Sequence, residues 1–176
     1  MVHIRRLSSV LLVFTSVVPA GPPLTAQAVL ASCSSVGAKA TLERLFNDQP
    51  QWDALLAGVA TGTPAWLEVA TTLHVVSDAG SSEQLGSAVG EALEHRPANV
   101  LTLAIPNFYL EVVCGPPDVD DPRFDSYKLS MAAIERREAK VRSISKPSLS
   151  GVRDSCISEL EKAKGDVSRY YNDIVP

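Results

Sequence analysis

The chain has 176 residues and a formal net charge of −4 at pH 7, and 45% of its residues are hydrophobic. This length and composition suit one ordinary domain with a real core. The negative charge excludes attraction to nucleic acid or to an anionic membrane through the overall field of the protein.

Residues 1–28 have the pattern of an export signal. A short basic start with Arg5 and Arg6 is followed by an uncharged apolar stretch from Leu7 to Ala20, and Ala26-Gln27-Ala28 supplies small residues for a signal peptidase. Cleavage after Ala28 leaves 148 residues with a net charge of −6. We therefore expect an exported protein of the periplasm or cell envelope, or else a secreted or lipid-anchored one.

The three cysteines favour one disulfide in an oxidising compartment. Leu30-Ala31-Ser32-Cys33 has the sequence of a lipobox, the site at which bacterial lipoproteins are acylated. Lipidation of Cys33 would leave Cys114 and Cys156 as a pair, and ordinary cleavage after Ala28 is the competing interpretation. In either case we predict a disulfide between Cys114 and Cys156.

Residues 29–38 are small and polar and are predicted to be a flexible tether, which leaves 39–176 as a single α-helical domain. Pro50 and the pair Thr63-Pro64 mark two early helix starts, and Ser81 with Gln84 resembles a capping box. The clearest amphipathic stripe follows, with helical spacing that predicts a buried face; its members are Leu85, Ala88, Val89, Ala92 and Leu93.

The second half of the chain continues in the same way. Pro97 begins a short helix, and residues 108–114 are apolar and interpreted as helix rather than as a short strand. Asp121-Pro122 is expected to start a long basic helix, and Lys146-Pro147 separates it from the last one. The sequence predicts an all-α fold of about seven mostly short helices.

Residues 64–104 run as helix, acidic turn, helix rich in small residues, proline and helix. This order resembles a HEAT-like repeat, which implies a short right-handed stack of helices. An irregular bundle remains the alternative, since no second copy with matching residues is found.

Charge is divided unevenly along the chain. From Thr41 to Asp121 twelve acidic residues face two basic ones, a net charge of −10, whereas residues 122–176 carry +3. One interpretation is a solvated surface whose two halves attract each other, and the other is an acidic face that steers a basic protein partner. The residues proposed for partner binding are Glu91, Glu94, Asp118, Asp120 and Asp121.

Catalytic and metal-binding patterns are not found in the sequence. His74 and His95 lack metalloprotease spacing, no Gly-x-Ser-x-Gly elbow occurs, and the acids at 118–125 lack the glycine and glutamate of an EF-hand. We therefore expect no cofactor, metal or catalytic residue. Arg136 and Arg137 are interpreted as a solvated helix face rather than as a binding rim.

These observations favour an exported, non-enzymatic domain that binds a protein. In size, class and location it is similar to small periplasmic immunity or inhibitor proteins, which cover the active site of an enzyme. The alternatives are a cell-envelope hydrolase that uses carboxylates, and a lipid-anchored structural protein of the envelope.

Overall fold

The computed structural model describes residues 23–119 and 121–173, and within these residues the chain is helical and contains no β-strand. The predicted all-α class is thus confirmed. Nine α-helices are described instead of about seven; α1 was not expected, whereas the short helix predicted at Pro97 is present as the three-residue α6.

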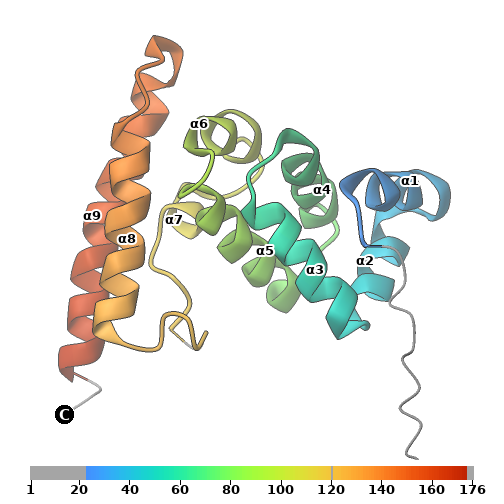
Figure 1. Cartoon of the computed structure of the whole chain (residues 1–176), viewed down its shortest axis with the longest axis horizontal. Helices are drawn as coiled ribbons and strands as arrows, with labels where there is room; N and C mark the ends of the chain where they lie inside the picture. Colours follow the sequence, from blue (N-terminus) through green and yellow to red (C-terminus); the bar gives the residue numbers. More distant parts are fainter. Residues whose placement is uncertain (1–22, 120, 174–176) are drawn as a thin grey trace, which may run out of the picture.

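The helices form an arc, with α1 and α2 at one end, α3 to α5 in the middle, and the long hairpin of α8 and α9 at the other end (Figure 1). A π-helical segment, Val100–Ala104, follows α6, and a 3-10 turn, Pro147–Leu149, precedes α9. The α-helices are α1 (Ala26–Val36), α2 (Ala38–Phe46), α3 (Gln49–Ala60), α4 (Pro64–His74), α5 (Ala79–Ala92), α6 (Pro97–Asn99), α7 (Leu110–Val113), α8 (Tyr127–Arg142) and α9 (Ser150–Asp173).

Polar caps set where the helices begin. Asp78 caps α5, since its side chain accepts from the backbone N–H of Ser81, so the helix begins at Ala79 and the capping box predicted at Ser81 lies three residues too late. Similarly, α8 begins at Tyr127 because Ser126 is its cap. The start predicted at Asp121 is wrong.

The N-terminal residues of the described chain are helical and packed. In place of the flexible tether predicted for 29–38, the structure has most of α1, and Val29 is only 1% exposed. Gly37, with φ of 92°, turns the chain directly into α2 in a conformation that suits glycine. The Ser32 and Thr41 hydroxyls lie 3.0 Å apart and join the two helices. Residues 1–22, which hold most of the predicted export signal, lie outside the described residues.

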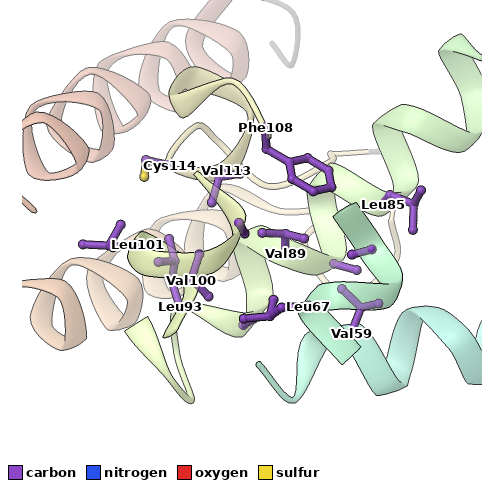
Figure 2. Packing of buried hydrophobic residues seen from close by; sticks show 14 of the residues in the cluster. Val59, Leu67, Leu85, Val89, Leu93, Val100, Leu101, Phe108, Val113 and Cys114 are labelled. Atoms are coloured by element: carbon purple, nitrogen blue, oxygen red, sulfur yellow. The ribbon is translucent and has the colours of Figure 1, made fainter. Parts of the chain in front are cut away.

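One apolar core extends from α1 to α9. Leu85, Val89, Ala92 and Leu93 are all fully buried, which confirms the face predicted for α5. Figure 2 shows Leu85, Val89 and Leu93 among side chains from the preceding and following helices; those labelled are Val59, Leu67, Val100, Leu101, Phe108, Val113 and Cys114.

The hairpin of α8 and α9 is joined to the core by a disulfide. The sulfur atoms of Cys114 and Cys156 lie 2.10 Å apart, and their Cα atoms lie 5.4 Å apart, in agreement with the pairing predicted from the sequence. Because Cys114 ends the α7 segment and Cys156 lies in α9, the bond connects the middle of the arc to its C-terminal end.

Candidate functional site

A groove of about 840 Å³ lies between α3, α5 and residues 116–118 and 121–124, and Arg137 of α8 also lines it. Its α3 wall is formed by Asp53, Ala57 and Ala60, which are spaced by four and three residues and so share one helix face. Its volume falls within the range of about 300–1,000 Å³ that is usual for ligand sites.

The two helices that line the groove run in the same direction. Near their starts, Trp52 Nε1 donates a 2.6 Å hydrogen bond to Gln84 Oε1. Near their ends, a side chain at Gly62 would contact Ala92 at 3.3 Å. Between these two contacts, several side chains of the two helices line the groove, most of them small: Leu56, Ala57, Ala60, Ser87 and Ala88.

Residues 116–118 and 121–124 form the third wall, which is fixed at Phe124. The carbonyl of Phe124 accepts from the Ser130 hydroxyl at 2.6 Å and from the Tyr171 hydroxyl at 3.2 Å. Arg123 donates to both carboxylate oxygens of Glu91 on α5, at 2.7 and 2.8 Å. It also contacts Asp121 at 2.6 Å, so this arginine closes the third wall onto the groove.

Arg137 of α8 lines the groove and has an unusual environment. Its side chain is only 3% exposed, and its Nε has no hydrogen-bond partner. The nearest carboxylate oxygen belongs to Glu94 at 4.0 Å, beyond hydrogen-bond distance, and Glu94 is bound by Arg136 at 2.7 Å. Burial lowers the pKa of Arg137, but an arginine keeps its charge at neutral pH.

The structure changes the interpretation of the acidic residues predicted to bind a partner. The side chains of Glu91 and Glu94 are both only 19% exposed, and they are paired with Arg123 and Arg136 of the same chain. Asp121 is paired with Arg123, and hydrogen bonds from that guanidinium lower its pKa. Asp118 lines the groove. Asp120 lies outside the described residues.

The site itself was missed by the sequence analysis, because Arg137 was taken for part of a solvated face. A signal for its burial was present: Arg137 lies three residues after Ile134 and four before Val141, on the apolar stripe of the helix. Both of those residues are fully buried, and Arg137 is buried with them.

Cys33 and His74, the other residues singled out in the sequence, lie away from the groove. Cys33 is half-buried in α1, where burial raises the pKa of its thiol, and its lipidation stays a prediction. His74 stacks on Phe108 with ring centroids 4.1 Å apart, and its Nδ1 lies 3.1 Å from the Ser82 hydroxyl. The Ser82 contact connects the end of α4 to α5, and the stacking connects it to Phe108, which precedes α7.

Two further observations concern the described residues. None of their helices has the length and apolar character needed to cross a membrane. No group of three or more histidine, cysteine, aspartate or glutamate side chains among them is placed to hold a metal ion.

The comparisons with known proteins gave no match, whether with family models, with curated proteins or with solved structures. The function of this chain therefore has to be inferred from the geometry of the groove.

Proposed function

We propose that this protein is an exported, non-enzymatic binding domain that holds a peptide segment of a protein partner in the groove between α3 and α5. The observation that carries this proposal is the groove itself, which follows two parallel helices and has a buried, incompletely hydrogen-bonded arginine at one end. A groove lined by two parallel helices, with small residues from both, suits an extended chain better than it suits a compact small molecule.

The acidic residues support binding more than catalysis. A carboxylate hydrolase needs one acid that stays protonated near neutral pH. In the groove, Glu91 and Asp121 are both held by Arg123, and the pKa of Asp121 is lowered. This arrangement keeps Asp121 ionised and unsuited to donate a proton.

The ion pairs also argue against long-range steering as the basis of recognition. Glu91, Glu94 and Asp121 are neutralised by arginines of the same chain, so they contribute less to an outward field than the sequence suggests. Recognition through the shape and hydrogen-bonding groups of the groove is the better-supported mode.

Two tryptophan variants test the proposal. Ala57 and Ala54 are both exposed on α3, but only Ala57 lines the groove. We expect the A57W side chain to fill the channel and the A54W side chain to leave it open. Cell-envelope extract from the source cells is passed over the immobilised wild-type chain and over both variants, and the retained proteins are identified by mass spectrometry.

The expected result is one protein retained by the wild-type chain and by A54W but lost with A57W. Thermal unfolding of both variants controls for folding. Retention of the same proteins by all three chains, or no specific retention by the wild-type chain, would reject the groove as a protein-binding site.

A further inference from the structure

We infer that the segment bound in the groove presents a carboxylate group to Arg137. This inference rests on the proposed function and specifies which chemical group the groove recognises. It starts from the environment of the Arg137 side chain, for which the fold provides burial but an incomplete set of hydrogen-bond acceptors.

A buried guanidinium without acceptors is unfavourable, because the group loses its water and gains nothing in exchange. Arg137 packs near the Phe124 ring, with its Cζ 6.0 Å from the ring centroid, and Glu94 is too distant to accept a hydrogen bond. A side chain at Gly90 would lie 2.9 Å from the Val113 carbonyl oxygen and 3.4 Å from Arg137 Nη1, so the glycine lets the chain at Val113 and the Arg137 side chain approach α5 closely. The enclosed Nε is thus without an acceptor, and because Arg137 lines the groove, a ligand there would approach the guanidinium through its Nη atoms.

The surrounding charges favour a group with a single negative charge. Two arginines and three carboxylates already line this part of the groove, so each added negative charge is repelled; they are Arg123, Arg137, Glu91, Asp118 and Asp121. A carboxylate adds one negative charge and matches the planar fork of a guanidinium. A phosphate dianion would add two charges close to Glu91, which makes it the less favourable ligand.

The other end of the groove has the opposite character. Asp53 accepts a 2.7 Å hydrogen bond from Gln49 but has no cationic partner among its described contacts. Gln84 and Glu91 are seven residues apart on α5, about 10 Å along the helix axis, which an extended chain covers in about three residues. We expect the bound segment to run from a carboxylate at Arg137 towards Asp53.

Three short peptides probe this interaction, and they separate the two sources of a carboxylate. Acetyl-Ala-Ala-Ala with a free C-terminus carries a terminal carboxylate, acetyl-Ala-Glu-Ala amide carries a side-chain carboxylate, and acetyl-Ala-Ala-Ala amide carries none. Each is titrated into the ¹⁵N-labelled full chain while the Nε–H signal of Arg137 is followed by NMR.

We expect at least one of the two acids to shift the Arg137 signal saturably, and the amide without a carboxylate to leave it unchanged. R137K keeps the charge but loses the planar fork, so it should weaken binding of that acid about ten-fold or more. If R137K does not fold, A57W is used instead, with A54W as its matched control. The A57W side chain blocks the groove and leaves Arg137 in place, so the acid should no longer shift the Arg137 signal.

An equal response to the acids and to the neutral amide would overturn the carboxylate inference. So would the absence of any response to all three probes, which would mean that water satisfies Arg137. Neither result contradicts the proposed function if the partner captured by the wild-type chain is not captured by the A57W chain. The proposed function would be rejected by a different result, namely capture of the same partner by the wild-type and A57W chains.

Discussion

The two ends of the arc are stabilised by different interactions. From α1 to α5 the fold is held by apolar burial: Trp52, Leu55 and Leu67 are at most 1% exposed, and no ion pair joins two described residues within this part. The α8–α9 hairpin buries fewer large side chains, such as Ile134 and Leu160, and carries ion pairs within and between its helices.

The difference follows from the sequence of each part. The N-terminal helices are short and rich in leucine, valine and alanine, so they can only be stable by packing against one another. The hairpin helices have 16 and 24 residues and many charges, and each forms favourable pairs along its own surface. The stability of the part from α1 to α5 should therefore change little with salt concentration and pH, whereas the stability of the hairpin should depend on both.

The largest effect is expected at the bond that joins the two parts. The double variant C114S/C156S opens a loop with a sequence separation of 42. The chain-entropy relation gives a loss of about 4 kcal/mol in the free energy of unfolding. Urea unfolding measures the loss, and hydrogen exchange should show α8 and α9 losing protection first. A loss below about 1 kcal/mol would mean that packing alone holds the hairpin in place.

Truncation in the apolar part should have the next largest effect. Leu85 is fully buried, so L85A should lower the free energy of unfolding by about 3 kcal/mol, through lost transfer energy and a cavity. The loss should be the same in low and high salt. The control is L129A, because Leu129 is 44% exposed on α8 and its truncation should change stability little. Equal losses at both positions would contradict the comparison.

The hairpin should show a pH-dependent contribution from Glu138. Hydrogen bonds from Lys164 and Arg142 hold the pKa of Glu138 below its ordinary value of 4.5. Since the folded pKa is the lower one, the stabilisation is complete above the ordinary value and is lost as pH falls through the folded value. E138Q should therefore destabilise the protein by about 1–2 kcal/mol at pH 7 and by much less near pH 2.

Urea unfolding of wild type and E138Q at the two pH values gives this difference directly. This comparison requires that the wild-type chain is still folded at pH 2. Near-UV circular dichroism checks that it is. A difference that is unchanged between pH 7 and pH 2 would show that the E138Q effect does not come from ionic pairing.

The smallest effect is expected where the two parts meet through exposed ion pairs. Arg136 is 55% exposed in its pair with Glu94, so E94Q should change stability by only about 0.5 kcal/mol, and less at high salt. E83Q is the control, at an exposed position on α5, the helix that precedes Glu94. A loss well above 1 kcal/mol for E94Q, unaffected by salt, would mean that Glu94 acts mainly on the buried Arg137.

Features that depend on residues close together in the chain are predicted better from the sequence than features that depend on residues far apart. The α5 face and the disulfide pair depend on spacing and cysteine parity, and both agree with the structure. Helix starts depend on which of several nearby polar residues accepts the first backbone N–H, and at Asp78 the choice was missed. The groove depends on contacts between residues far apart, such as Arg123 with Glu91, which no local pattern contains.

Because α1 is packed into the fold, the position of a peptidase cut near it affects how well the N-terminal end of the mature protein is held. Thr25 caps α1 and Val29 is part of the core. A peptidase cut after Ala28 would remove the cap and the first turn, and a cut before Cys33 would remove Val29 as well. We therefore expect chains cut at either site to be less stable at the N-terminal end, and more open to proteolysis there, than chains that keep Thr25.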